Sequence, residues 1–382
     1  MTQRLHIGWL WSSIVLMLLT ACSSSDEMEE KQPTMLTVYV YSPEHPTLIR
    51  GAFDEVNASV EESKITRLQI WIFENNDTHK KVAYFDTGET SLLSAGEGAT
   101  YQIPVSDDFA QRKPAVDVYV IANLPEGEYG NTLNAESTRA NVQESTIPEG
   151  YFGLTTLTTA VPGEGLPMAG KLENQPVIGD APVLRIGTQS NIATVQLTRC
   201  VSKVRFVFAN TTGSSNLYIT GITLNAGMIP NAEYLIPRTP MEISGGYNSS
   251  TKPLFSGSVK PVASVDNPTI YIYDGQEAQE YEDFINTFIN TSATEENLIE
   301  VGPFYLRESD KKLSGEIAYK IGKIDNEEQP GAVFKMNQEG DFSRNHTWIV
   351  YAYHLGGGFL EMNALYLKDW TTRTIDHEVY NW

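Results

Sequence analysis

Apolar side chains recur at alternate positions through 35–41. Successive side chains of a β-strand point to opposite faces, so this pattern predicts a strand with one face on a hydrophobic core. The residues on the predicted core face are Leu36, Val38 and Val40. The range 42–63 that follows is polar and aperiodic and carries two prolines and Arg50-Gly51. That composition predicts a loop within reach of a protease.

Short strand patterns separated by turn residues continue through the chain, and no long helical period appears. The range 115–124 is nearly continuously apolar, which predicts a central strand covered on both faces. The range 194–209 predicts a long strand with a register change near Arg199, and we interpret it as the first strand of a second domain. Short helices are expected within 128–150 and at 278–290. The other predicted strands are 65–74, 81–86, 99–105, 217–224, 269–273, 315–321, 346–354 and 361–367.

These elements predict an all-β fold of two β-sandwiches in series. The length of 382 residues agrees with two domains. The formal net charge of -21 argues against nucleic acid as a partner and against attraction to anionic lipid.

The start of the chain has the pattern of an export signal. Arg4 precedes an apolar run at 8–19, which is shorter than the roughly 20 residues that a helix needs to span a bilayer. The run ends in Leu19-Thr20-Ala21-Cys22, which resembles the bacterial lipobox, where the signal is cleaved before a cysteine that receives a lipid. The alternative is an ordinary signal peptide with a chance cysteine. With Cys22 lipidated, Cys200 has no partner for a disulfide, and we expect it to be a buried small hydrophobic residue.

The sequence offers no catalytic residues, cofactor site or metal site. None of the six histidines has a metal-ligand spacing with cysteines or carboxylates, and we expect His346 and His354 to be structural or solvent-facing. No nucleophile elbow, phosphate loop or dinucleotide fingerprint occurs. We expect the pairs Glu61-Glu62 and Asp107-Asp108 to be solvated turn carboxylates. Asp369-Trp370 suits glycan binding, core packing or a contact in a polymer.

Several segments, in this order, resemble the FimA/Mfa fimbrillin superfamily of Bacteroidetes, the subunits of type V pili. They are the lipobox at Cys22, the strand followed by Arg50-Gly51-Ala52-Phe53, Leu68-Gln69-Ile70-Trp71-Ile72-Phe73, Val118-Tyr119-Val120-Ile121-Ala122-Asn123, Leu166-Pro167-Met168-Ala169-Gly170, Leu197-Thr198-Arg199-Cys200-Val201-Ser202-Lys203-Val204, and the ending from Asp369-Trp370 to Trp382. Each segment alone is a strand with a turn. Their order and spacing, over nearly the whole chain, carry the resemblance.

The resemblance implies transthyretin-like sandwiches and a maturation pathway. The precursor travels as a lipoprotein to the outer membrane, and an arginine-specific protease cuts between Arg50 and Gly51. The first strand leaves with the lipid, and the C-terminal segment of another subunit fills the groove. The implied ranges are signal peptide 1–21, propeptide 22–50, N-terminal sandwich 51–190, C-terminal sandwich 191–368 and donor segment 369–382.

The implied donor residues are Trp370, Ile375, Val379, Tyr380 and Trp382. Ile375 and Val379 share one strand face, while Tyr380 and Trp382 share the other, so which of them enter the groove stays open. The implied product is a shaft or tip subunit of a cell-surface fimbria. Its partners would be other fimbrial subunits in a homo- or hetero-polymer, the protease, the outer membrane through the precursor's lipid, and a host or bacterial surface ligand.

A second hypothesis keeps the first strand in place. The chain would then be an outer-membrane surface lipoprotein, either a fimbrial anchor or a monomeric binder of glycan or a host ligand. Intact residues 23–50 and a saturable ligand would distinguish it. An enzyme is the third and weakest hypothesis.

Overall fold

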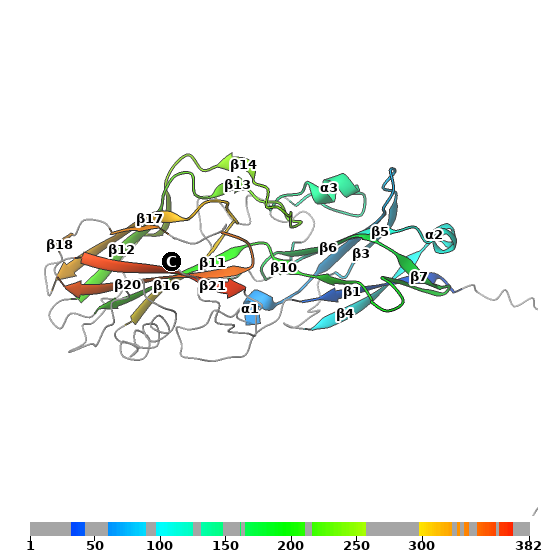
Figure 1. Cartoon of the computed structure of the whole chain (residues 1–382), viewed down its shortest axis with the longest axis horizontal. Coiled ribbons are helices and arrows are strands. Elements are labelled where there is room, and N and C mark those ends of the chain that lie inside the picture. The colour runs from blue at the N-terminus through cyan, green and yellow to red at the C-terminus, as the bar shows by residue number, and fades with distance from the viewer. Residues whose placement is uncertain are drawn as a thin grey trace, which may run out of the picture. The chain divides into compact units, whose positions relative to one another are not determined.

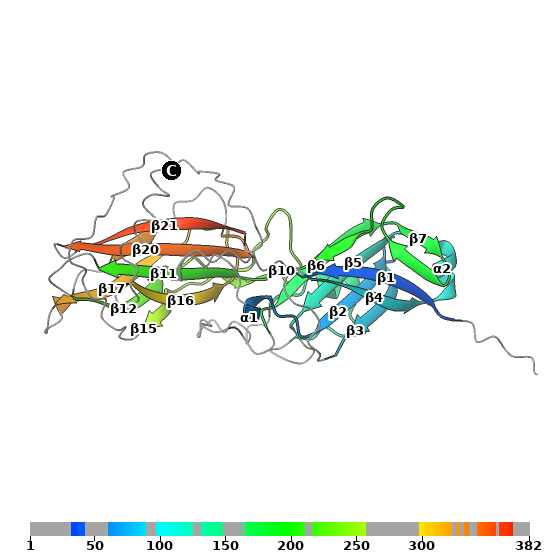
Figure 2. The same cartoon turned by 90° about the horizontal axis from the view of Figure 1, so that it is seen from below.

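The computed structural model describes residues 32–42, 60–88, 97–124, 131–147, 161, 165–210, 216–256, 298–322, 327–328, 332–335, 342–356 and 359–369. The described residues from Thr34 onward belong to one compact unit. Most of them lie in strands, and Figures 1 and 2 show the strands in two orthogonal views. The strands form antiparallel and mixed sheets, which confirms the all-β prediction.

The first pair of sheets is built before position 200. One sheet has the order β4-β1-β8-β7, with β9 also paired to β1; the second has the order β10-β6-β5-β2-β3. The bounds in the first sheet are β1 (Thr34–Tyr41), β4 (Gly98–Val105), β7 (Val177–Asp180), β8 (Val183–Ile186) and β9 (Thr194–Gln196). Those in the second are β2 (Leu68–Glu74), β3 (Lys81–Asp86), β5 (Val116–Ala122), β6 (Met168–Gln175) and β10 (Thr198–Arg199).

The second pair of sheets uses the later strands. One sheet has the order β16-β11-β20-β21; the other has the order β15-β12-β17-β18, with β19 also paired to β17. The bounds in the former are β11 (Ser202–Asn210), β16 (Leu298–Leu306), β20 (His346–Gly356) and β21 (Phe359–Asp369). Those in the latter are β12 (Asn216–Leu224), β15 (Lys252–Ser256), β17 (Ser314–Gly322), β18 (Glu327–Glu328) and β19 (Ala332–Lys335). A separate hairpin joins β13 (Pro230–Ala232) and β14 (Ser244–Tyr247).

Each pair of sheets encloses its own hydrophobic core. The first core takes alternate side chains of β1, β2, β5 and β8, and the second takes those of β11, β12, β16, β17 and β20. A third cluster lies on the other face of β2 and β5, where Trp71 and Tyr119 pack with Leu235 and Cys200. As predicted, β5 is buried on both faces, and Cys200 is a buried free cysteine.

The predicted single strand at 194–209 is instead three strands in three sheets. β9 pairs with β1, β10 pairs with β6, and β11 pairs with β16 and β20. The chain leaves the first sheet where Gly170 of β6 passes β9, and a Cβ at Gly170 would lie 2.4 Å from the carbonyl oxygen of Gln196. Period-2 alternation does not reveal such sheet changes, because the polypeptide stays extended throughout.

The described helices are short. They are α1 (Val60–Ser63), α2 (Asp107–Arg112) and α3 (Arg139–Gln143). Ser106 caps α2 by accepting a hydrogen bond from Phe109 N, and Thr138 and Asn141 form a capping box on α3. α3 confirms the helix expected within 128–150, while α1 and α2 replace the turns expected at their carboxylate pairs.

The sequence patterns missed several strands, among them β7, β8 and β13 to β16. β16 contains Gly302-Pro303, and proline within a run normally argues against a strand. Its position at the edge of its sheet explains why proline is tolerated there. The strand expected at 269–273 and the helix expected at 278–290 lie outside the described residues. The transthyretin-like topology, the domain boundaries and the donor segment stay predictions.

Candidate functional site

β1 lies inside its sheet, with neighbours along both edges. On one side all eight of its residues pair with β4, from Thr34↔Val105 to Tyr41↔Gly98. On the other side it runs parallel to two shorter strands, pairing with β8 through residues 35–37 and with β9 through residues 39–41. Figure 2 shows β1 beside β4 in the first pair of sheets. Without β1, this sheet would have two facing edges with unpaired backbone groups.

The side chains of β1 match the alternation of the sequence. Leu36, Val38 and Val40 are each at most 1% exposed and belong to the first core. Burial of three aliphatic side chains stabilises the fold by roughly 5–9 kcal/mol, at about 1.5–3 kcal/mol each. β1 therefore contributes three fully buried side chains to this core.

β4 depends on β1 for its backbone pairing. Among the described strands, β4 pairs only with β1. Its other contacts are made by side chains, such as the ring of Tyr101 against that of Phe85 in β3, with centroids 5.7 Å apart. A separate anchor is needed if β4 is to keep its place without β1.

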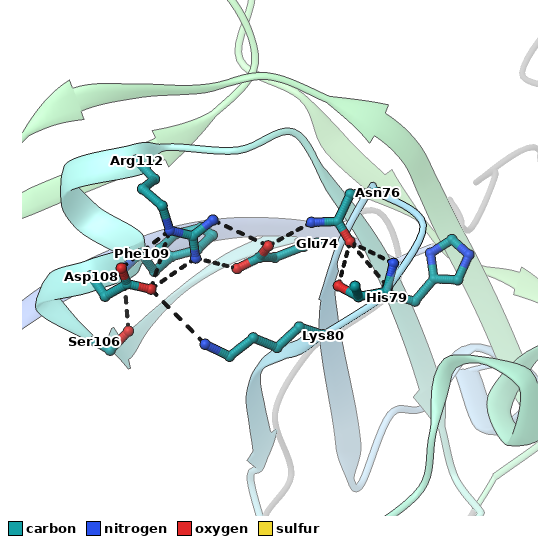
Figure 3. A network of polar contacts seen from close by, with 9 residues as sticks. Glu74, Asn76, His79, Lys80, Ser106, Asp108, Phe109 and Arg112 are labelled. Atoms are coloured by element: carbon teal, nitrogen blue, oxygen red, sulfur yellow. Dashed lines mark hydrogen bonds and ion pairs between the residues drawn. The ribbon is translucent and has the colours of Figure 1, made fainter.

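A polar network at the end of β4 supplies this anchor, as Figure 3 shows. Arg112, at the end of α2, lies 2.5 Å from Glu74 at the end of β2 and 2.9 Å from Asp108. Asn76, in the turn after β2, donates a second hydrogen bond to Glu74 at 2.7 Å. The network ties the helix that follows β4 to the opposite sheet, and the contacts described above involve no residue of β1.

The same network explains the charge state of its carboxylates. The hydrogen bond from Arg112 lowers the pKa of Glu74, against the opposing effect of burial. It also lowers the pKa of the exposed Asp108. Glu74 is therefore held ionised beside the guanidinium, and Asp108 remains a solvated carboxylate as expected.

A second, buried cluster fixes α1, the first described element after residue 42. Lys203 Nζ of β11 lies 2.9 Å from Glu62 Oε1, and the hydroxyl of Tyr305 donates to the same oxygen at 2.6 Å. Arg199 donates to Glu62 O at 2.9 Å and to Ser63 Oγ at 2.7 Å. The expectation of a solvated Glu62 is wrong, because its side chain is only 2% exposed and lies against these buried cations.

Burial dominates the electrostatics of this cluster. It lowers the pKa of Arg199 to about 10 and also lowers the pKa of Lys203, against the favourable charge of Glu62. Burial raises the pKa of Tyr305, so its phenol stays protonated and donates to Glu62. Glu62 is thus the carboxylate that offsets buried positive charge between α1 and the second pair of sheets.

A further connection joins residues 145–147 to 233–235. Leu235 N donates to Ser145 O and Ile147 N donates to Glu233 O. Arg344 holds the second segment through Leu235 O at 2.8 Å and Glu233 at 3.0 Å. Burial raises the pKa of Cys200 to about 12, so this neighbouring thiol stays protonated and unreactive.

The structure describes only part of the set predicted from the sequence. Leu36, Val38 and Val40 lie together in the first core. Cys22, Arg50 and Gly51, and the donor residues Trp370, Ile375, Val379, Tyr380 and Trp382, lie outside the described residues. Asp369 is the last residue of β21. His346 is half-buried at the start of β20, with Nδ1 2.6 Å from Arg344 O.

The described part of the chain lacks two features. No group of histidine, cysteine or carboxylate side chains there is arranged to hold a metal ion. No helix there is both long and apolar enough to cross a membrane.

Sequence reasoning missed the polar residues that hold α1 and α2 in place. Glu62, Arg112 and Tyr305 carried no motif. A signal did exist in the same-parity cations Arg199, Lys203 and Arg205, because cations in a strand expected to be buried require carboxylate partners.

Solved structures with similar folds are fimbrial and adhesion proteins of Bacteroidetes. They include the tip fimbrial protein Mfa3 of Porphyromonas gingivalis (14% identity, TM-score 0.41, covering 87% of this chain and 99% of that one). A fimbrial assembly protein of Parabacteroides distasonis matches with 11% identity, a TM-score of 0.41, and coverage of 88% and 96%. A proposed cell adhesion protein of the same species matches with 13% identity, a TM-score of 0.44, and coverage of 87% and 96%.

At these identities and TM-scores, no residue role, ligand or assembly state is transferred to this chain. No protein-family model and no curated protein matches the chain.

Proposed function

We propose that the chain is a subunit of an adhesive surface filament that assembles by strand exchange. In this proposal it is exported as a lipoprotein on Cys22, cut between Arg50 and Gly51, and polymerised when the 369–382 segment of another subunit takes the place of β1. The observation that carries the proposal is the position of β1. It is an interior strand, it contributes three side chains to one core, and it comes before the predicted cut.

The physical chemistry of the groove supports a strand as the occupant. Removal of β1 would expose the edges of β4 on one side and of β8 and β9 on the other, together with an apolar trough. A strand from another chain would pair with both edges, as in other strand-addition complexes. Three to five buried side chains would contribute on the order of 5–15 kcal/mol before association costs.

Contacts that do not involve β1 hold the two sides of the groove, which favours strand exchange over collapse of the sheet after β1 leaves. The Glu74–Arg112 network and the Glu62 cluster fix β4 and α1 through residues that β1 does not supply. A groove whose walls have independent anchors costs less to reorganise when a new strand enters.

The experiment is limited digestion of residues 23–382, the chain without its signal peptide and Cys22, with an arginine-specific protease. Native gels follow. We expect a cut at Arg50 and a ladder of polymers. An Arg50→Lys variant is the matched control and should stay uncut and monomeric. A variant ending at Asp369 should be cut at Arg50 but form no ladder. Cleavage of the 23–382 chain at Arg50 without formation of polymers would contradict self-assembly.

The second candidate is a surface lipoprotein that keeps β1. The deep burial of Leu36, Val38 and Val40 favours it, because release of β1 must overcome their packing. Resistance of Arg50 to the protease while other sites are cut would favour this candidate, with the role of a fimbrial anchor or a binder of glycan or host ligand.

A further inference from the structure

The arginines of this chain are distributed unevenly. Three lie near the ends, at Arg4, Arg50 and Arg373. All the others lie within the described residues: Arg67, Arg112, Arg139, Arg185, Arg199, Arg205, Arg238, Arg307 and Arg344. Apart from 43–59, which contains Arg50, the internal ranges outside the described residues contain Lys260 and Lys323 but no arginine.

Four of these arginines are buried. Arg199, Arg205, Arg307 and Arg344 are each at most 7% exposed. A protease that recognises arginine must take the side chain into its own pocket with the backbone extended around it. These four side chains are out of reach in the folded chain.

Others are half-buried and held by carboxylates. Asp86 binds Arg67 through two hydrogen bonds of 2.9 and 2.6 Å, and the buried Asp117 lies 2.8 Å from Arg139. Arg112 is 43% exposed, but like Arg139 it lies in a helix, whose backbone cannot extend without unwinding. Arg185 lies within β8, between β1 and β7.

Arg238 is the most informative case, because it lies in no helix or strand. Its guanidinium lies 3.6 Å from the ring centroid of Tyr234. It also contacts Glu144 at 2.8 Å and Glu242 at 2.5 Å, and donates to Gln143 O. Side-chain contacts alone hold this arginine in place.

Two lysines of the described residues, in contrast, are well exposed. The Lys80 side chain is 63% exposed in the turn between β2 and β3 and has a loose 3.9 Å contact with Asp108. Lys312 is exposed between β16 and β17. Arginine forms better planar, multidentate contacts than lysine does. That preference does not explain why the internal ranges outside the described residues, apart from 43–59, lack arginine.

We propose that the folded body, from Arg67 to Arg344, keeps its arginines inaccessible to proteases. Arginine-directed cleavage is thereby confined to the propeptide. This rests on the proposed processing at Arg50. In that step one water is consumed, the peptide bond after Arg50 breaks, and Arg50 gains a carboxylate while Gly51 gains a free amine. The placement of arginine would let an arginine-specific protease mature the subunit without destroying it.

The test compares arginine-specific and lysine-specific proteases on the native 23–382 chain, with cut sites mapped by mass. We expect no cut at any arginine from Arg67 to Arg344, and cuts at Lys80 and Lys312. A Lys312→Arg variant should gain a cut by the arginine-specific enzyme. Cleavage at the body arginines as fast as at Lys80 would overturn the proposal. So would a chain that resists both enzymes, because general compactness would then explain the resistance.

A second variant tests the contacts of Arg238 directly. Glu144→Gln with Glu242→Gln should produce a cut after Arg238, at a rate roughly tenfold or more above the undetected wild-type level, because release of the side chain limits the reaction. Glu136→Gln with Glu316→Gln, two exposed positions elsewhere, is the matched control and should leave the rate unchanged. An equal rate in the two double variants would contradict the assigned role of these carboxylates.

The outcomes separate this inference from the proposed function. If neither Arg50 nor the arginines from Arg67 to Arg344 were cut, the processing step would be rejected, and only the inaccessibility of the arginines from Arg67 to Arg344 would stand. A body cut at its arginines would reject the inference whatever happens at Arg50. Cleavage at Arg373, which lies in the proposed donor segment, would contradict confinement to the propeptide.

Discussion

The Glu62 carboxylate lies 2.9 Å from Nζ of Lys203, across 141 residues of sequence. Glu62 belongs to α1, and Lys203 to β11 of the second pair of sheets. Both side chains are buried, at 2% and 7% exposure. This contact fixes the chain shortly after the predicted cut, so α1 would keep its place after β1 leaves.

Glu62→Gln should destabilise the chain by about 3–5 kcal/mol, because it removes the carboxylate that offsets buried cations. Urea unfolding followed by tryptophan fluorescence measures the loss. The double variant Glu62→Leu with Lys203→Met should be more stable than Glu62→Gln alone, because it removes both charges at similar volume. A single variant as stable as the wild type would show that this ion pair does not hold α1.

Leu36→Ala should weaken only the uncut chain. Its side chain is fully buried in β1, and such truncations cost about 2–5 kcal/mol. After cleavage and release of β1, the variant and wild-type proteins have the same sequence and should unfold together. Leu68→Ala on β2 is the control, since it lies in the same core and should weaken both forms. A difference that persists in the cleaved protein would mean that β1 has stayed bound.

Arg112→Met should destabilise the chain at neutral pH, because the buried Glu74 loses its charged partner. Arg112 lowers the pKa of Glu74 below its ordinary value of 4.5. The stabilisation is therefore complete above pH 4.5 and is lost as the pH falls through the pKa of the folded state. Unfolding curves at several pH values should show the gap between wild type and variant narrowing below pH 4.5. A gap that widens in acid would contradict the assignment.

Gly170→Ala should destabilise the first pair of sheets by about 1–3 kcal/mol, because a Cβ there meets the backbone of β9. Gly221→Ala is the matched control on a strand, since its Cβ would lie at an ordinary 3.5 Å from Ala318 Cβ. Thermal unfolding of both variants compares the two sites. Equal melting temperatures would argue against the close crossing of β6 and β9.

Local pattern was enough to predict most of the strands that line the cores. The alternation of Leu36, Val38 and Val40 placed them on the buried face, and the continuous apolar run of β5 predicted a central strand. These predictions succeeded because burial follows the period of the strand. The same reasoning failed at 194–209, where one extended run serves three sheets.

Local sequence pattern could not predict the polar contacts of Glu62 or those between Arg112 and Glu74. Glu61 and Glu62 are neighbours in sequence, yet their side chains are 64% and 2% exposed. The difference arises from Lys203 and Tyr305, which are far away along the chain. Long-range pairing of this kind is set by the tertiary fold and has no period to detect.

The most direct test of the account is the mass and N-terminal sequence of the mature protein recovered from the surface of the cells that make it. The account predicts a chain that begins at Gly51, carries no lipid and belongs to a polymer. A chain that begins at a lipidated Cys22, with β1 still attached, would contradict strand exchange and identify a permanently anchored lipoprotein.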